Sequence, residues 1–199
     1  MGARAAARRA RSLAVALAAM AFAACAGAPP GGGAPEPAPV IKIVFPVVAD
    51  SVHFASGWMD DRENGRKHHG QDIFCPRWTP VLAVVSGTVD WLLDAPPKAP
   101  KGYRLIVKGD DGNVYYYDHL NNDDPGTRDN SAAPRYAYAR GLKNGDRVSA
   151  GDIIGYVGDS GSAEQWGPHL HFEIHIGKRG NPIDPLPSLR AALARRGQH

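Results

Sequence analysis

The sequence predicts an all-β domain, an antiparallel sheet or sandwich with long loops and one short C-terminal helix. Two observations support this prediction. From Val40 onward, short apolar runs rich in β-branched residues alternate with Gly, Pro, Asn and Asp, which is the pattern of short strands joined by turns. Near the C-terminus, a single segment has the composition of a helix. The 199 residues suffice for one modest domain with a core and additional segments.

The N-terminal residues differ in composition from the rest. Met1 to Ser12 hold four arginines and no acid, and the apolar run Leu13 to Ala24 follows. A basic segment before a short apolar segment is typical of a secretory signal, and this run is shorter than the ~20 residues that cross a bilayer. We therefore predict that residues 1–24 are a signal peptide and that the mature chain is exported to the periplasm or cell envelope.

Two cleavage patterns are open at the end of this segment. Residues 21–25 are Ala-Phe-Ala-Ala-Cys and resemble a bacterial lipoprotein signal, in which Cys25 becomes the acylated first residue. Ordinary cleavage after Ala23 or Ala26 is the alternative. Lipidation is the preferred interpretation, and it predicts a protein tethered to a membrane. The second cysteine, Cys75, is expected to be a buried free thiol rather than half of a disulfide.

The remaining composition limits the partners. Residues 25–39 are rich in Pro, Gly and Ala and poor in large apolar side chains, so they are predicted to be a linker. Removing residues 1–24 takes away four arginines and no acid, which changes the formal charge from +3 to −1. A nucleic-acid partner requires a basic face on the folded domain, so no nucleic acid is expected to bind.

Residues 40–186 are predicted to form the domain, which is built from short strands. The predicted strands are Ile41 to Val48, Val81 to Val85, Thr88 to Leu93, Arg104 to Lys108, Val114 to Tyr117, Ile153 to Val157 and Leu170 to Ile176. Residues 110–113 and 143–146 are expected to be hairpin turns, because each contains a glycine that tolerates positive φ. A helix is predicted over Pro187 to Arg196, within a C-terminal tail of residues 187–199.

Two inserts with prolines, residues 94–102 and 123–141, interrupt the strands. We expect both to form loops that wall a cleft. Tyr136, Tyr138 and Trp166 lie in or near these loops, and they either contact a ligand in the cleft or cap the local core. The inserts therefore predict where a binding groove would be enclosed.

The last predicted strand has an unusual polar face. Between residues 169 and 176, apolar and polar side chains alternate, as Leu170, Phe172, Ile174 and Ile176 against His169, His171, Glu173 and His175. This is the two-residue period of a strand with one face buried. A buried imidazole nitrogen needs a hydrogen-bond partner or a metal, and side chains two residues apart lie about 7 Å apart. Alone, a His-x-His pair is more often a polar strand face.

A second cluster favours a metal site. The segment from Gly65 to Phe74 is also predicted to be a strand, on which His68 and Asp72 share one face while His69 points the other way. Together with one histidine of the later strand, they offer two imidazoles and a carboxylate. Zn²⁺ accepts such a set at about 2.0–2.2 Å and keeps one coordination position open. This composition is typical of a catalytic rather than a structural zinc site.

Three motifs carry a resemblance to a known family. They are His-x-Gly-x-Asp at residues 68–72, Tyr-x-His-Leu at residues 117–120 and Gly-Pro-His-Leu-His-Phe-Glu at residues 167–173. The sequence resembles the lysostaphin or LytM-type zinc metallopeptidases, which are peptidoglycan endopeptidases, over roughly residues 45–185. Two features depart from the family pattern: Trp78 stands where glycine is common, and the loop at residues 123–140 is longer than usual. They bear on loop shape and substrate fit.

The resemblance implies a set of site residues and a function. The implied zinc ligands are His68, Asp72 and His171, and the implied catalytic residues are His119 and His169. The implied activity is zinc-dependent hydrolysis of peptide bonds in the stem or cross-bridge peptides of peptidoglycan. Because the sequence has no His-Glu-x-x-His motif, proton transfer falls to the two catalytic imidazoles, and the division of roles between them stays open.

Other polar residues near the motifs have more than one interpretation. Glu173 is either an acceptor for the N–H of a ligand histidine or a carboxylate on the strand surface. His69 and His175 are predicted to be structural. These three residues therefore belong to the surroundings of the predicted centre rather than to it.

Two alternatives to an endopeptidase remain open at this point. A non-catalytic envelope adaptor that activates other cell-wall hydrolases would suit a lipid tether, but such domains typically lack one or more metal ligands, and none of the five implied positions is substituted here. A cupin-like metal barrel also begins from His-x-His. It needs further Glu and His ligands, and after His175 the sequence contains no Glu and a single histidine, His199.

Overall fold

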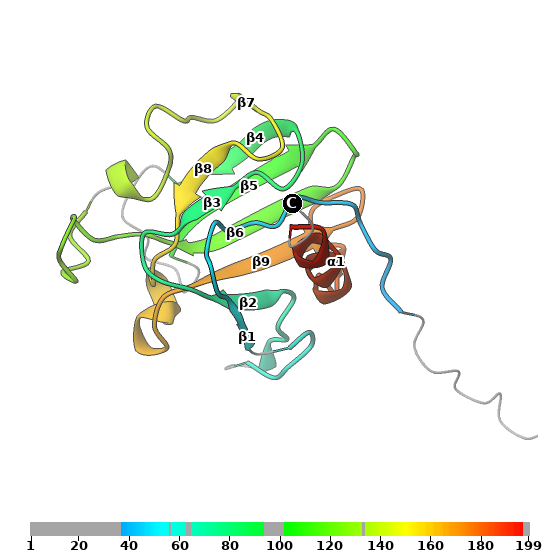
Figure 1. Ribbon diagram of the computed structural model, residues 1–199, viewed down its shortest axis with the longest axis horizontal. Coiled ribbons are helices and arrows are strands. Elements are labelled where there is room, and N and C mark those ends of the chain that lie inside the picture. The colour runs from blue at the N-terminus through cyan, green and yellow to red at the C-terminus, as the bar shows by residue number, and fades with distance from the viewer. Residues whose placement is uncertain (1–36, 56, 63–64, 94–101, 133, 197–199) are drawn as a thin grey trace, which may run out of the picture. The chain divides into compact units, whose positions relative to one another are not determined.

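The computed structural model describes residues 37–55, 57–62, 65–93, 102–132 and 134–196 (Figure 1). The predicted signal peptide, most of the predicted linker and most of the insert at residues 94–102 lie outside these residues. None of the helices that the structure describes has the length and apolar composition needed to cross a bilayer.

The described part of the chain forms two antiparallel sheets, 3₁₀ helices and one α-helix (Figure 1). The large sheet has the order β1-β2-β9-β6-β5-β4-β7, and β10 also pairs with β9. Its strands are β1 (His53–Ala55), β2 (Gln71–Phe74), β4 (Gly87–Leu92), β5 (Tyr103–Gly109), β6 (Val114–Leu120), β7 (Arg147–Val148), β9 (His169–His175) and β10 (Pro182–Ile183). The small sheet pairs β3 (Pro80–Leu82) with β8 (Ile153–Tyr156). The helices are η2 (Pro134–Tyr136), η3 (Gly161–Gln165) and α1 (Leu186–Arg196).

The predicted fold class, antiparallel β with a short C-terminal helix, is confirmed. The helix α1 begins one residue earlier than predicted and packs on the core through Leu189 and Ala192. The turn at residues 110–113 joins β5 to β6 as predicted, with Gly112 at φ +82°. The turn at residues 143–146 is present but is not a hairpin, because it follows the loop of the second insert and leads into β7, which pairs with β4.

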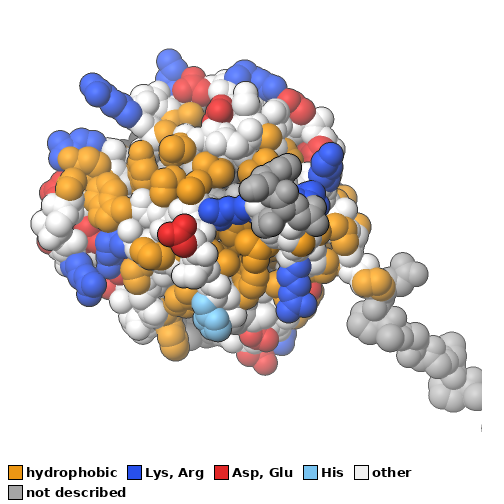
Figure 2. Space-filling model, in the orientation of Figure 1, with side chains coloured by type: hydrophobic (Ala, Val, Ile, Leu, Met, Phe, Trp, Pro, Cys, Tyr) orange, Lys and Arg blue, Asp and Glu red, His pale blue; other side chains and the backbone are white. Residues whose placement is uncertain are grey.

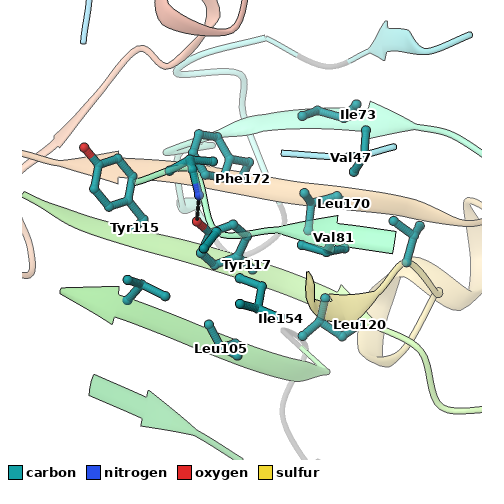
Figure 3. Packing of buried hydrophobic residues seen from close by; sticks show 14 of the residues in the cluster. Val47, Ile73, Val81, Leu105, Tyr115, Tyr117, Leu120, Ile154, Leu170 and Phe172 are labelled. Carbon is teal, nitrogen blue, oxygen red and sulfur yellow. Dashed lines mark hydrogen bonds between the residues drawn. The ribbon is translucent and has the colours of Figure 1, made fainter. Parts of the chain in front are cut away.

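The hydrophobic core lies between the two sheets (Figure 3). Val81 of β3 and Ile154 of β8 meet the inward side chains of the large sheet. Those inward side chains include Ile73, Leu105, Tyr117, Leu170 and Phe172. Each is almost completely removed from water, and such burial contributes roughly 1.5–3 kcal/mol for each large apolar side chain. The core therefore fixes which face of each strand is left for polar residues.

One predicted strand is not formed. Residues 41–48 run alongside β3 with the isolated bridge Val47–Val81, but they make no continuous ladder. The Val44 N–H donates to the Val84 carbonyl, whereas the Val84 N–H that would complete this pair donates to the Tyr117 hydroxyl instead. The next two pairs are also half made: the Leu82 N–H donates to the Pro46 carbonyl and the Val48 N–H to the Pro80 carbonyl, but the two prolines have no N–H to donate in return.

This bond between sheets makes a testable contribution to stability. The Tyr117 hydroxyl accepts the Val84 N–H at 3.0 Å inside the core (Figure 3). In the variant Tyr117→Phe the buried N–H loses its partner, so the free energy of unfolding should fall by about 1–3 kcal/mol, measured by urea denaturation followed by circular dichroism. Tyr116→Phe is the control, since the Tyr116 ring is held by stacking on His175 and by Arg104. Equal losses in the two variants would contradict this account.

The strand β9 is buried on both faces, which differs from the predicted strand with one buried face. Leu170, Phe172 and Ile174 point into the core. The polar side chains of the strand are each at most 5% exposed, namely His169, His171, Glu173 and His175. Every polar atom on this second face therefore needs a partner.

Candidate metal centre

Three buried side chains converge on the polar face of β9. The register of the large sheet places Asp72 of β2 directly beside His171 of β9, and His68 reaches them from the segment that precedes β2. His68 Nε2 lies 2.9 Å from His171 Nδ1 and 3.1 Å from Asp72 Oδ1, and His171 Nδ1 lies 2.9 Å from Asp72 Oδ1. All three residues are at most 5% exposed.

The other ring nitrogens fix the tautomers of the two histidines. His68 Nδ1 lies 2.9 Å from the Gly57 carbonyl oxygen, and His171 Nε2 lies 2.8 Å from Glu173 Oε1. These oxygens accept hydrogen bonds, so the protons reside on His68 Nδ1 and His171 Nε2. The nitrogens that face each other then carry lone pairs. Two lone pairs and a carboxylate oxygen converge on one point, which is an arrangement that a cation stabilises.

The charge on Asp72 fits a cation site. The Arg62 guanidinium donates to Asp72 Oδ2 at 2.8 Å, and this charged partner stabilises the ionised form of the buried carboxyl group. The carboxylate is therefore ionised at every physiological pH. Two neutral imidazoles and one carboxylate are a typical donor set for catalytic zinc.

The separations of the donor atoms are close to those of a zinc site. With bonds of about 2.0–2.2 Å, tetrahedral zinc keeps its ligand atoms roughly 3.3–3.6 Å apart. The observed separations of 2.9–3.1 Å are shorter by a few tenths of an ångström, which small side-chain rotations provide. His68, Asp72 and His171 thus fit zinc in donor type, protonation and spacing.

A buried polar network holds His171 in place. Glu173 accepts from His171 Nε2 at 2.8 Å and from His175 Nε2 at 2.6 Å, and His175 Nδ1 in turn accepts the Gly180 N–H at 3.0 Å. Glu173 is therefore a buried acceptor for a histidine of the site and not a carboxylate on the strand surface. His175 supports Glu173, which agrees with its predicted structural role.

A second cluster of potential metal ligands shares His171 with the first cluster. Asp118, His171 and Glu173 also lie close enough together to hold an ion. However, Arg104 binds both oxygens of Asp118 at 2.5 and 2.6 Å, and Glu173 already accepts from two imidazoles. This group is therefore better suited to orient His171 than to bind metal.

Gly70, the glycine of the first motif, is required because there is no space for a side chain at this position. A Cβ atom at Gly70 would lie 2.6 Å from the Phe172 carbonyl oxygen and 2.8 Å from Cε1 of His171. Both distances are too short for any side chain. Gly70 therefore lets β9 and the His171 ring approach the segment that carries His68.

His119 and His169 lie beside the three converging side chains. Their ring centroids are 4.9 Å apart, and the His119 ring is 6.0 Å from that of His171. His169 Nε2 lies 3.9 Å from Asp72 Oδ1. The structure thus brings all five residues that the resemblance implied to one place, from β2, β6, β9 and the segment before β2.

Both of these histidines are neutral, and each binds a backbone carbonyl oxygen through Nδ1. His119 Nδ1 lies 2.8 Å from the Ser160 carbonyl oxygen, and His169 Nδ1 lies 2.9 Å from the Gly167 carbonyl oxygen, so each Nδ1 holds the proton. Burial lowers the pKa of His119 to about 3 and also lowers the pKa of His169. Each Nε2 therefore presents a lone pair that can accept a proton.

The backbone of His119 is unusual. This residue ends the aromatic strand β6 with φ +62°, in the left-handed region that non-glycine residues seldom adopt. Such conformations cost of order 1–3 kcal/mol and persist where the surrounding structure holds them. The strained backbone turns the imidazole toward His169.

The route by which His68 reaches the site differs from the prediction. β2 begins at Gln71, so His68 and Asp72 do not share the face of one strand. His68 is held by two backbone bonds to a preceding loop, from its own N–H to the Asp60 carbonyl and from the Met59 N–H to its own carbonyl. His69 is exposed beside Trp58, in line with its predicted structural role.

Arg62 contacts the site and was not predicted from the sequence. Its Nη2 donates to Asp72 Oδ2 at 2.8 Å, while Asp72 Oδ1 faces the two histidines. The guanidinium thus holds one carboxylate oxygen, while the other faces the two histidines. Arg62 lies six residues before His68 in a loop, where no periodic pattern or motif marks it.

Replacing Arg62 should weaken metal binding. Without its guanidinium, Asp72 is free to rotate, and outer contacts of this kind typically contribute 10–100-fold in affinity. We expect Arg62→Ala to bind zinc at least about 10-fold more weakly, as measured by competition with a chromogenic chelator. Arg66→Ala is the control, because Arg66 is an exposed residue of the same loop. An unchanged zinc affinity in Arg62→Ala would refute this role.

Ion pairs anchor the start of the second insert close to the site. Arg77 pairs with Asp123 of the insert and binds both oxygens of Asp159 at 2.6 and 2.5 Å. Asp159 precedes Ser160, whose carbonyl oxygen accepts from His119. Burial of this cluster anchors the start of the insert next to His119.

Trp78 keeps the loop shape that a glycine would give. Its φ is +69°, the left-handed conformation that usually requires glycine, and its ring meets those of Tyr136 and Tyr156 at 5.3 and 6.0 Å. Tyr138 belongs to the core, and Trp166 is 68% exposed. Of the three loop aromatics considered from the sequence, Tyr138 therefore caps the core, while Trp166 is free to contact a ligand.

Comparisons with known proteins agree with this geometry. Residues 127–185, which include His169 and His171, match Peptidase family M23. The L-Ala–D-Glu endopeptidase of Bacillus subtilis is 30% identical over 160 residues, covering 74% of this chain and 43% of the relative. Lysostaphin of Staphylococcus simulans is 32% identical over 133 residues, covering 65% of this chain and 22% of the relative. The chain thus spans less than half the length of these relatives.

Solved structures show the same fold. The catalytic domain of lysostaphin from Staphylococcus simulans superimposes with a TM-score of 0.54 and 28% identity, covering 70% of this chain and 92% of that domain. The fold and the relatives bear out the resemblance seen in the three motifs. The chain therefore carries a peptidase family M23 domain of the lysostaphin and LytM type and is closely related to the endopeptidases of that family.

Proposed function

We propose that this protein is a zinc-dependent endopeptidase that hydrolyses peptide bonds in the stem or cross-bridge peptides of peptidoglycan. One observation carries the proposal: three acceptor atoms, of His68, Asp72 and His171, converge within 3.1 Å of one another beside two further neutral imidazoles. A domain that served only as an adaptor would have no need to bury this set.

His68, Asp72 and His171 would hold the ion. Zinc supplies a Lewis acid that polarises the scissile carbonyl and makes water more acidic at neutral pH. His119 and His169 carry their lone pairs on Nε2, so each can take a proton from water or return one to the leaving amine. A protonated imidazole there also stabilises the tetrahedral oxyanion.

The surroundings of the imidazoles support this proton transfer. Each Nδ1–H is bound to a backbone carbonyl, of Ser160 for His119 and of Gly167 for His169. These bonds hold the rings in one tautomer with Nε2 directed away from the backbone. Because both rings are buried, bulk water does not compete for the proton. Either residue suits either role.

The substrate class is proposed from the relatives. Curated relatives are named for an L-Ala–D-Glu bond and for a glycyl-glycine bond, and both kinds of bond occur in cell-wall peptides. We propose that an exported enzyme, tethered by a lipid on Cys25, meets this substrate in the cell envelope. Product analysis of defined muropeptides by mass spectrometry would identify the bond.

The test uses purified sacculi. Protein that lacks only residues 1–24, loaded with zinc, should release new amino termini from sacculi, and His119→Ala should not. If the wild-type protein and His119→Ala are indistinguishable, the hydrolase proposal is wrong. Folded wild-type protein that takes up no zinc and releases nothing would favour the adaptor instead.

A further inference from the structure

A second concave site lies away from the metal centre. A groove of about 630 Å³ runs between the segment at residues 42–48, the strand β3 and the end of α1, and none of the five predicted site residues lines it. The segment and the helix lie on the side of the large sheet that carries the core, whereas the metal centre lies on its other face. The groove therefore plays no part in the proposed hydrolysis.

The lining of the groove is apolar with a basic rim. Its apolar residues include Val44, Val48 and Val85. Its charged residues are Lys42, Arg195 and Arg196, and no Asp or Glu of the described part of the chain lines it. Figure 2 shows apolar side chains gathered on the face that carries these elements, with basic side chains beside them. Such a lining matches a molecule with an apolar chain and an anionic head.

The two arginines are fixed over the groove without being neutralised. Arg195 Nη2 donates to the Ile43 carbonyl at 3.0 Å, and Arg196 Nη1 donates to the Val47 carbonyl at 3.1 Å. These partners are neutral oxygens of the groove wall. Among the described residues, no carboxylate forms an ion pair with Lys42, Arg195 or Arg196. Their positive charge is thus available to an anion.

The same segment exposes an apolar row to solvent. Val40, Val44 and Val48 are 61%, 37% and 47% exposed. Apolar side chains clustered on a surface and rimmed by basic groups are typical of sites that meet a membrane interface. Within the described residues, this row adjoins the groove, because Val44 and Val48 also line it.

The position of the groove along the chain favours a membrane as the partner. Lys42 lines the groove, and 16 residues separate it from Cys25. A chain of that length reaches at most about 60 Å when fully extended. If Cys25 carries the lipid of the proposed function, on which this step rests, the groove is held within about that distance of the bilayer.

We propose that this groove binds an anionic phospholipid of the membrane. The apolar lining receives an acyl chain, and Lys42, Arg195 and Arg196 pair with the phosphate of the headgroup. Binding would turn this side of the domain toward the bilayer. The metal centre, on the opposite face of the large sheet, would then face the cell wall.

The test is vesicle flotation with the chain from residue 25 onward, in which Cys25→Ser prevents acylation. The protein should bind vesicles that contain phosphatidylglycerol and should not bind vesicles of phosphatidylcholine alone. The double variant Arg195→Gln, Arg196→Gln should bind about 30-fold more weakly, since each basic residue near an anionic surface contributes roughly a factor of five. Val44→Ser, Val48→Ser should also bind more weakly.

A matched control separates the groove from general charge. The variant Arg190→Gln, Lys178→Gln removes two exposed basic residues that do not line the groove, and it should keep most of the vesicle binding. Equal losses in the control and the arginine variant, or equal binding to both kinds of vesicle, would overturn the proposal. A dimer in sedimentation experiments that the arginine variant loses, without any vesicle binding, would assign the groove to a second copy.

Vesicle binding is measured independently of the hydrolase assay. The arginine variant should release amino termini from isolated sacculi at the wild-type rate, because the groove lies apart from the metal centre. A midpoint of thermal unfolding equal to that of the wild-type protein would show that the variant is folded. Vesicle binding without hydrolysis would contradict only the proposed hydrolase function. Hydrolysis without vesicle binding would contradict only the proposed lipid site.

Discussion

Replacing His171 with alanine is expected to abolish both zinc binding and peptide release. His171 is the central donor of the site: its Nδ1 lies 2.9 Å from both His68 Nε2 and Asp72 Oδ1. Its removal leaves two donors, so the ion loses a defined geometry. Affinity should fall by more than the 10–100-fold typical of an outer contact, and hydrolysis should fall to background.

Zinc analysis and the sacculus assay check this prediction together. The wild-type protein should hold about one zinc per chain, a chelator should remove metal and activity together, and added zinc should restore both. His69→Ala is the matched control, since His69 is an exposed neighbour of a ligand and should keep metal and activity. If the variant His171→Ala stays active and binds about one zinc per chain, the proposed ligand set is wrong.

Replacing His119 should separate catalysis from metal binding. Its Nδ1 is bound to the Ser160 carbonyl, and its ring lies 6.0 Å from that of His171, beside the three proposed ligands. Loss of a proton-transferring group typically lowers the rate by 10²–10⁴-fold. We expect this loss with an unchanged zinc content.

The choice of substitution follows from the backbone. His119 has φ +62°, and asparagine tolerates this region better than most residues. His119→Asn therefore removes the imidazole with little added strain, whereas alanine would combine both effects. Zinc content, thermal unfolding and the rate on defined muropeptides are the measurements. If zinc is lost together with activity, His119 belongs to the metal site or to its scaffold and not to proton transfer.

The sequence predicted the strands well where side chains alternate. β9 was evident because Leu170, Phe172 and Ile174 alternate with polar residues, and the period of two depends on local geometry alone. The segment at residues 41–48 has similar apolar residues, yet it forms no strand. Pro46 lacks the N–H that one pair with β3 needs, which the sequence itself shows, whereas the Val84 N–H is bound to the Tyr117 hydroxyl, a partner 33 residues away that no local pattern reveals.

The members of the site were named from motifs, but their arrangement was not. The resemblance implied His68, Asp72 and His171, and the structure places them together. The predicted position of His68 on one strand with Asp72 is wrong, because a loop holds His68 by backbone bonds to residues 59 and 60. Motif spacing therefore identified the residues without describing how they meet.

The type of the domain could be predicted from the sequence because alternation is a local property, and the family resemblance of three short motifs implied the residues of the candidate site. Tertiary structure alone decided which nitrogens face one another, that Arg62 holds Asp72, and that Glu173 orients His171. The pairing of β2 with β9 brings together residues that lie 99 positions apart. Such contacts depend on sheet register and loop packing, which no short stretch of sequence encodes.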